Sequence, residues 1–341
     1  MNESSIFTES IESFLKPISP LMNDASVSEI MINGPHEIWI EQKGILHKTD
    51  LKFKTTHDLD SALNNISQYC GRPYNTQNPI LETHLPDGSR LEAIMKPIAM
   101  NGPTVSIRRF SKKSLNIKSL ISNNTITHDA ALFLARAIAK KANIIVSGGT
   151  GSGKTSLLCA LSSFFPKTER IVVVEDTHEL ELQQPHAVYL ETRTADETGK
   201  GEITIRDLLH ATMRLRPDRI VVGEIRGIEA KDLIQAMTSG HAGSMTTIHA
   251  NTPSDALGRL ETLILMEGSQ LPYFAVRTQL ASAADIIIQI ARMPSGRRTI
   301  TDISMVSKKL QNENFILKQV FSLNSEGTLC KMSNKQKRAK K

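Results

Sequence analysis

Cysteine and aromatic side chains are scarce in this sequence of 341 residues. Its three cysteines are odd in number and form no CxxC pair, so neither a disulfide framework nor a four-cysteine zinc site is expected. Aromatic residues make up 4% of the chain, with one Trp and four Tyr, which leaves few platforms for stacking nucleic-acid bases. These absences argue against a disulfide-rich secreted protein and against a nucleic-acid motor.

Long apolar runs and a secretion signal are also missing. No 18 consecutive residues are apolar, and the first residues lack a basic stretch followed by an apolar one, so we expect a cytoplasmic protein. The net charge of +6 is modest, and much of it lies in residues 331–341, which include six basic residues and no acidic one. That charge run predicts a disordered tail over residues 326–341.

One glycine-rich stretch carries the strongest chemical signal. Residues 143–147 read as a buried strand, residues 148–155 match the P-loop pattern GxxxxGK[ST], and residues 156–165 read as a helix. Glycines let backbone N–H groups converge on phosphate oxygens at a helix N-terminus, while Lys154 reaches the β- and γ-phosphates and Thr155 holds Mg²⁺. The residues expected to bind ATP are Gly148, Gly149, Thr150, Gly151, Ser152, Gly153, Lys154, Thr155 and Ser156.

The remaining pattern divides the chain into two domains. Short alternating strands and one amphipathic helix predict a single α+β domain over residues 1–110, and a polar, basic stretch at 111–119 reads as a linker. From residue 120 to 325 strands alternate with helices, which is typical of an α/β domain with a mainly parallel sheet.

Two apolar strands in the second domain end in acidic residues. Residues 171–174 lead into Glu175 and Asp176, and residues 220–222 lead into Gly223 and Glu224. Phosphoryl transfer requires one carboxylate to support Mg²⁺ and another to orient or deprotonate water, and both are expected at the carboxyl ends of strands beside the P-loop.

Three further stretches resemble the motifs of one protein family. Residues 174–180 (VEDTHEL) resemble the "Asp box" of the type II/type IV secretion ATPase superfamily, 213–227 resemble its Walker B segment, and 239–251 resemble its "His box". Shorter matches at 106–110, 191–193, 199–202, 259–263 and 281–285 make the sequence most similar to the CpaF-type ATPases that assemble Flp (tight-adherence) pili. The resemblance runs from about residue 24 to residue 323. The longer N-terminal extension that is frequent in that branch is missing, and so is the four-cysteine zinc motif of the type II secretion and type IVa branches.

The resemblance implies a fold, an activity and partners. It implies a RecA-like P-loop domain, with a mainly parallel sheet, preceded by a smaller α+β (PAS-like) domain. It also implies a ring-forming ATPase, expected as a homo-hexamer, which uses ATP and Mg²⁺ at the inner face of the inner membrane. Its partners are expected to be platform proteins of a pilus or secretion system, with no nucleic acid. A conjugative or type IV secretion traffic ATPase is the alternative within the family, and a hexameric nucleic-acid motor is the alternative outside it.

The resemblance also assigns roles to individual residues. Glu175 corresponds to the base that activates water, although its neighbour Asp176 is an alternative, and Glu224 corresponds to the residue that supports Mg²⁺ through water. His241 is expected to couple the nucleotide state to the sheet, and His249 is expected near the same edge. His178, at a variable position of the Asp box, is expected at the surface. Arginines are expected from the first domain at the phosphates (Arg90 and Arg108, with Arg109 less favoured). Three others (Arg214, Arg216 and Arg226) are expected either at contacts between subunits or in salt bridges within the fold.

Overall fold

The computed structural model describes residues 11, 13–42, 44–109, 116–195, 199–266, 271–324 and 326–332. The chain forms two compact units, Met1–Lys113 and Ser114–Lys341. Within the described residues, none of the helices combines the length and the apolar character that crossing a bilayer requires.

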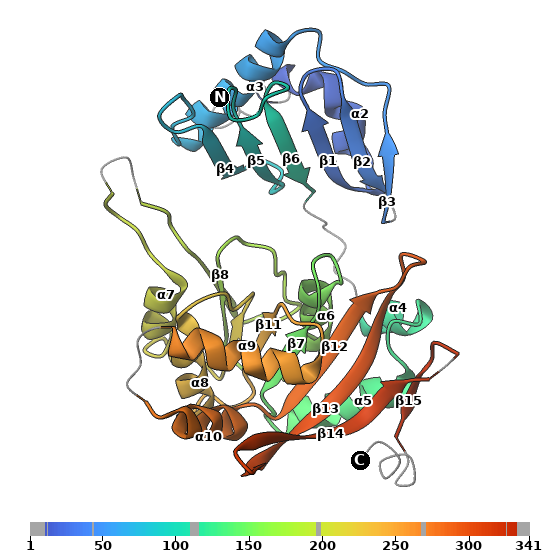
Figure 1. Cartoon of the computed structure of the whole chain (residues 1–341), viewed down its shortest axis with the longest axis vertical. Helices are drawn as coiled ribbons and strands as arrows, with labels where there is room; N and C mark the ends of the chain where they lie inside the picture. Colours follow the sequence, from blue (N-terminus) through green and yellow to red (C-terminus); the bar gives the residue numbers. More distant parts are fainter. Residues whose placement is uncertain are drawn as a thin grey trace. The chain divides into compact units, whose positions relative to one another are not determined.

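The first unit contains a six-stranded antiparallel sheet with strand order β3-β2-β1-β6-β5-β4 (Figure 1). Helix α3 begins with a capping box between Thr55 and Asp58 and ends at Gly71, whose φ of 61° suits glycine. Its apolar stripe packs with alternate residues of the strands into one core. The elements are η1 (Lys16–Ile18), α2 (Ser19–Asn23), β1 (Val27–Asn33), β2 (Ile38–Gln42), β3 (Ile45–Lys48), α3 (Thr56–Cys70), β4 (Ile80–His84), β5 (Arg90–Ile94) and β6 (Thr104–Arg108).

The second unit contains a nine-stranded sheet with strand order β15-β14-β13-β12-β7-β11-β10-β8-β9. The pairs from β12 to β9 are parallel, and the pairs from β12 to β15 are antiparallel, so the sheet is mainly parallel as predicted. The elements are α4 (Ile117–Ser122), α5 (His128–Ala139), β7 (Ile144–Ser147), α6 (Lys154–Ser162), β8 (Ile171–Glu175), β9 (Ala187–Glu191), α7 (Ile205–Thr212), β10 (Arg219–Val222), α8 (Glu229–Thr238), β11 (Met245–Ile248), α9 (Pro253–Leu265), α10 (Tyr273–Ala283), β12 (Ile286–Arg292), β13 (Arg298–Gln311), β14 (Asn314–Leu323) and β15 (Leu329–Lys331).

Helices cover both faces of this sheet. Ile144 and Val146 point into a core shared with α4, α5 and α6, whereas Ile145 points into a second core shared with α7, α8, α9 and α10 (Figure 1). Because the central strands are buried on both faces, β7, β8, β10 and β11 are buried at every position. This explains why β7, β8 and β10 are largely continuous apolar runs and do not alternate.

Two expected boundaries differ in the structure. The stretch expected as a linker over 111–119 already contains the start of α4, where Asn116 and Ser119 form a capping box; residues 110–115 lie outside the described part. The tail expected to be disordered from residue 326 contains β15, which pairs with β14 and buries Leu329. Residues 333–341, which carry most of the tail's charge, lie outside the described residues.

Candidate nucleotide site

The P-loop joins the carboxyl end of β7 to the amino end of α6. Gly151 and Gly153 adopt φ values of 68° and 93°, a backbone conformation that side chains with a Cβ rarely take. Lys154 is buried, and its Nζ donates a hydrogen bond to the carbonyl of Gly149 at 3.0 Å. The loop therefore already has the curl and the buried cation that a triphosphate needs, at the positive end of a helix.

A chain of polar contacts runs from this lysine across the carboxyl ends of the parallel strands. Lys154 Nζ lies 3.3 Å from both ring nitrogens of His249, and His249 Nε2 lies 2.8 Å from Glu224 Oε1. Arg226 donates a hydrogen bond to Glu224 at 2.8 Å and lies 3.7 Å from Asp176. We define these five residues as the carboxyl-edge cluster. It connects the P-loop to both acidic strand ends that the sequence singled out.

The histidine of this cluster is held neutral. Burial lowers the pKa of His249 below its ordinary value, and the neighbouring Lys154 ammonium lowers it further, against the opposing effect of Glu224. A neutral imidazole can accept a hydrogen bond on one nitrogen and donate one on the other. His249 is therefore suited to connect a cation and a carboxylate.

Glu175 is 3% exposed and differs from the rest of the site. Its carboxylate accepts hydrogen bonds from the backbone N–H of Glu179 at 3.2 Å and of Leu180 at 3.1 Å. Burial raises the pKa of Glu175 to about 7, although these N–H groups and His178 favour the charged form. A carboxylate with this proton affinity can exchange a proton near neutral pH, as a general base must.

Two features around Glu175 were not expected from the sequence. His178 is not a simple surface residue, because its Nδ1 lies 3.3 Å from Glu175 Oε2 and its ring packs edge-on against Tyr189, with centroids 5.0 Å apart. A Cβ at Gly223 would lie 2.9 Å from Glu175 Cγ, so only glycine leaves room for the glutamate on the neighbouring strand. This packing explains the glycine that stands before Glu224.

The site fits a metal ion that arrives with the nucleotide. Within the described residues, no three His, Cys, Asp or Glu side chains are grouped so that they could hold a metal by themselves. Mg²⁺ is commonly bound by one or two protein oxygens together with substrate phosphates and water. The Thr155 hydroxyl, at the half-buried start of α6, and Glu224, whose side chain is 18% exposed, are the predicted residues that suit this role.

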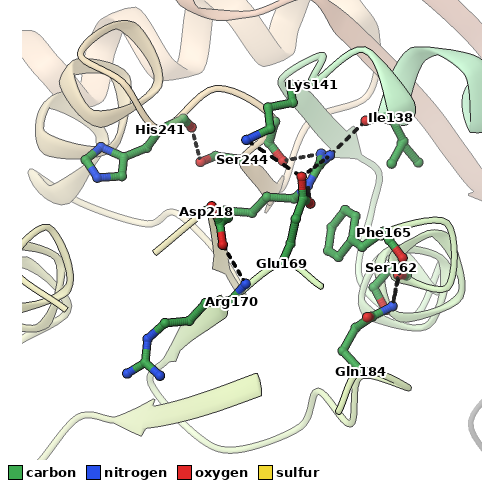
Figure 2. Close-up of polar contacts among 12 residues, drawn as sticks. Ile138, Lys141, Ser162, Phe165, Glu169, Arg170, Gln184, Asp218, His241 and Ser244 are labelled. Carbon is green, nitrogen blue, oxygen red and sulfur yellow. Dashed lines mark hydrogen bonds and ion pairs between the residues drawn. The ribbon is translucent and has the colours of Figure 1, made fainter. Parts of the chain in front are cut away.

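The two histidines of the His box lie at opposite edges of the sheet, so the expectation of a shared edge was wrong. His249 follows the carboxyl end of β11, whereas His241 precedes Met245, the first residue of that strand, whose partner Ile144 begins β7. Figure 2 shows His241 beside Ser244, which hydrogen-bonds to its carbonyl at 2.7 Å. Within this unit the length of a strand separates His241 from the P-loop, and its coupling role stays a prediction.

The three arginines around β10 are also divided between the two edges. Arg226 belongs to the carboxyl-edge cluster, as described above. Arg214 and Arg216 precede the strand and are exposed at its amino end. Arg214 and Arg216 therefore lie at the opposite end of the strands from the P-loop. A role at a subunit contact stays a prediction for all three arginines.

The arginines of the first unit fall into two environments. Arg90 and Arg108 are paired across β5 and β6, so both lie on the face of the sheet opposite the buried Leu91 and Ile107. Arg109 follows β6, and it donates a hydrogen bond to the carbonyl of Leu21 at 2.7 Å. Arg108 is exposed, whereas Arg109 is half-buried, and a role of either arginine at the phosphates stays a prediction.

One residue at the P-loop escaped prediction altogether. Arg298, at the start of β13, donates a hydrogen bond from Nε to the carbonyl of Gly151 at 3.1 Å. It is separated from the loop by nearly 150 positions of sequence. The basic residues that flank the turn before β13 were visible in the sequence, but nothing local indicated that this hairpin reaches the P-loop.

A phosphate-binding loop and acidic strand ends at one edge of a mainly parallel sheet define this unit as a RecA-like P-loop domain. The chain belongs to the family described as "Type II/IV secretion system protein", which matches residues 12–340.

Similar proteins are named for conjugal transfer and for type IV secretion. The chain is 34% identical over 283 residues to the conjugal transfer protein TrbB of Rhizobium radiobacter, which covers 81% of this chain and 83% of that protein. It is 30% identical over 321 residues to the type IV secretion system protein PtlH of Bordetella pertussis, covering 86% and 94%. The solved structure of the Legionella pneumophila ATPase DotB has a similar fold, with a TM-score of 0.63 at 18% identity, covering 87% of this chain and 81% of that one.

Proposed function

We propose that this protein hydrolyses ATP to ADP and phosphate and uses the free energy to drive a type IV secretion or conjugal transfer apparatus. Membership of the secretion family and the names of the similar proteins TrbB and PtlH support this activity and this setting. The Flp pilus branch expected from sequence motifs receives less support, because those relatives are named for conjugal transfer and type IV secretion.

The observation that carries the proposal is the unbroken contact from Lys154 through His249 to Glu224. When a triphosphate binds, its oxygens replace the Gly149 carbonyl as the partner of Lys154. Thr155 and Glu224 would hold the Mg²⁺ that arrives with the nucleotide, Glu224 through water, and the ion would supply positive charge beside the phosphates. Movement of Lys154 toward the phosphates alters its contact with His249, and the carboxyl-edge cluster thereby responds to the nucleotide.

Glu175 is assigned the role of general base. Its pKa of about 7 lets it take a proton from water near neutral pH, and its backbone hydrogen bonds fix the orientation of the carboxylate. Gly223 leaves room for Glu175 where β8 pairs with β10, one residue before Glu224. The two carboxylates then divide the work, with proton transfer at Glu175 and metal support at Glu224.

The assembly and partners belong to the same proposal. A ring of six identical subunits at the inner face of the membrane would act on membrane-embedded platform proteins of the apparatus. Closure of domains around ATP, driven by γ-phosphate contacts, is a general way in which such rings produce force.

The decisive experiment measures ATP binding and hydrolysis in the full chain and in Lys154→Ala. We expect hydrolysis to fall to background, because the buried ammonium that holds the phosphates is gone, while the folded structure remains. Lys140→Ala, an exposed lysine at the end of α5, is the matched control and should hydrolyse ATP normally. Equal hydrolysis in Lys154→Ala and the full chain would contradict the proposed site.

A further inference from the structure

The carboxylate of Glu175 has three bonded partners among the residues that the structure describes. Two of them are the backbone N–H groups of Glu179 and Leu180, at 3.2 and 3.1 Å. The third is the imidazole of His178, whose Nδ1 lies 3.3 Å from Glu175 Oε2. An amide N–H donates a hydrogen bond but takes up no proton, whereas an imidazole can do both. His178 is therefore the partner to which Glu175 can pass a proton.

A general base must lose its proton before the next turnover, and the surroundings of Glu175 restrict how it does so. The residue is 3% exposed, and as the base of the proposed reaction it must turn this small exposed part toward the attacking water. On the neighbouring strand, Gly223 packs so closely that a Cβ there would lie 2.9 Å from Glu175 Cγ. Because bulk water has almost no direct access to the carboxylate, another protein group has to carry the proton to solvent.

The ring of His178 extends from the base toward solvent and has a defined position. Its side chain is 38% exposed, whereas the side chain of Glu175 is 4% exposed. The ring packs edge-on against the ring of Tyr189, with centroids 5.0 Å apart. Tyr189 is fixed in turn, because its hydroxyl accepts a hydrogen bond from the backbone N–H of Leu182 at 3.0 Å. One ring nitrogen of His178 is thus held at the base while the ring stays partly in water.

The other titratable side chains near this contact do not accept the proton. Burial raises the pKa of the Tyr189 hydroxyl on β9 and of the Cys159 thiol on α6 above their ordinary values, and the negative charge of Glu181 raises both further. Both groups therefore keep their own proton near neutral pH. This leaves His178 as the side chain beside Glu175 that can accept one.

We propose that His178 relays the proton of the attacking water from Glu175 to solvent. The inference rests on the proposed function, and it gives a role to a residue that the phosphate-binding motifs do not include. Before the step, the neutral ring carries its hydrogen on Nε2. Glu175 takes a proton from water as the water oxygen bonds to the terminal phosphorus and ADP leaves. Glu175 Oε2 passes this proton to His178 Nδ1, and the ring releases the other proton from Nε2 to solvent. Exchange with solvent then returns the hydrogen of the neutral ring from Nδ1 to Nε2.

Chemical rescue of the full chain tests the relay. ATP turnover of His178→Ala is measured in dilute buffer at about pH 9, where Glu175 is charged and few buffer molecules accept protons. We expect turnover to fall about tenfold with an unchanged KM for ATP, a smaller loss than removal of the base itself should cause. Added imidazole, which can occupy the space of the missing ring and accept the proton, should restore most of the turnover.

Two further variants separate a relay from a contact that only holds Glu175 in place. His178→Asn keeps an N–H group near the position of Nδ1 but takes up no proton, so its turnover should be as low as that of His178→Ala. His186→Ala removes another histidine of the same unit, whose ring lies 2.6 Å from Arg170 at the amino end of the strands. It is the matched control, and it should show normal turnover and no response to imidazole.

The relay and the proposed function fail in different ways. Normal turnover in His178→Asn would show that the ring only positions Glu175, and it would overturn the relay. A loss in both His178 variants that imidazole does not restore would overturn it as well. Full turnover in His178→Ala, together with low turnover in Glu175→Gln, would remove the relay and leave the base in place. If the unaltered chain did not hydrolyse ATP, the proposed function itself would fail.

Discussion

Charged residues cluster both at the amino ends and at the carboxyl ends of the strands of the nine-stranded sheet, which we call its amino edge and its carboxyl edge. The two clusters are built differently. At the amino edge, Arg219 is 0% exposed and is paired with Glu169 at 2.5 Å. Its other donors reach the carbonyls of Ile138 and Gly243, and its guanidinium lies 4.7 Å from the ring of Phe165. Figure 2 labels Ile138, Phe165 and Glu169 among these partners. This arginine is therefore buried among protein groups, and a ligand has little access to it.

At the carboxyl edge, most charged groups keep access to solvent. Glu224, His249 and Arg226 are partly exposed and contact one another in a row that begins at Lys154. Mutual contacts between partly exposed groups can be exchanged for ligand contacts at low cost, whereas a buried ion pair cannot be opened without leaving an uncompensated charge. The comparison supports the proposal that the carboxyl edge serves chemistry, whereas the contacts of the amino edge contribute to stability.

The largest effect is expected at the carboxyl edge. Glu175→Gln should lower ATP turnover by about 10²- to 10⁴-fold, because glutamine cannot accept the proton, while nucleotide binding stays near that of the unaltered chain. Steady-state hydrolysis and a nucleotide titration measure both quantities. Asp176→Asn is the matched control, and near-normal turnover in Glu175→Gln together with a large loss in Asp176→Asn would move the base to Asp176.

The next largest effect is expected at the amino edge. Arg219→Ala should lower the free energy of unfolding by about 4 kcal/mol, because Glu169 loses its buried partner and two carbonyls lose their donor. Urea denaturation followed by circular dichroism measures the change. Lys141→Ala removes the exposed second partner of Glu169 and should cost about 1 kcal/mol or less.

A double variant sharpens this test. Arg219→Leu combined with Glu169→Leu removes both charges and should recover much of the lost stability, since apolar pairs often replace buried ion pairs without cost. A low stability in the double variant, equal to that of Arg219→Ala, would contradict an account based on the uncompensated charge.

A smaller effect is expected from two arginines of the first unit. Arg108 is exposed, whereas Arg109 is half-buried and bonded to the carbonyl of Leu21. We propose that Arg108 acts on the nucleotide phosphates, so Arg108→Ala should lower turnover by roughly tenfold to a hundredfold, the loss of one charge-assisted hydrogen bond. Arg109→Ala should instead lower stability, since Arg109 anchors Leu21. Turnover that is unchanged in Arg108→Ala but reduced in Arg109→Ala would reverse this assignment.

The smallest effect is the pH dependence of the base. Because burial raises the pKa of Glu175 to about 7, turnover should fall roughly fivefold from pH 7 to pH 6 and level off above pH 8. The folded state binds this proton more tightly than the unfolded state, so the same group should make the protein less stable as pH rises from about 4.5 to 7. Glu175→Gln should abolish that stability change, and its persistence would assign it to another group.

Removal of His178 sharpens the pH test. Its contact with Glu175 favours the charged carboxylate, so His178→Ala should raise the pKa of Glu175 and shift the turnover profile to higher pH. An unchanged profile would show that His178 does not influence the base.

Local sequence patterns were sufficient for the parts of the fold that depend on neighbouring residues. The P-loop was predicted because glycine positions, a lysine and a helix start within eight residues specify it. The mainly parallel sheet was predicted because apolar runs alternate with helical patterns, and the structure confirms that prediction. The start of α4 was missed because its capping box lies within a polar stretch. The strand β15 was missed because its three residues lie at the start of a stretch whose basic charge predicted disorder.

The sequence by itself determined which residue types stand at the strand ends, since β8 and β10 each lead into their own acidic residue. Only the tertiary structure decided which of them meet. Parallel pairing of β7 with β11 places His249 at the P-loop and His241 a strand's length away, although the two belong to one motif. Packing of β10 on β8 requires Gly223, and the antiparallel hairpin after β12 brings Arg298 to Gly151. Such contacts depend on the register and order of strands, which no local pattern specifies.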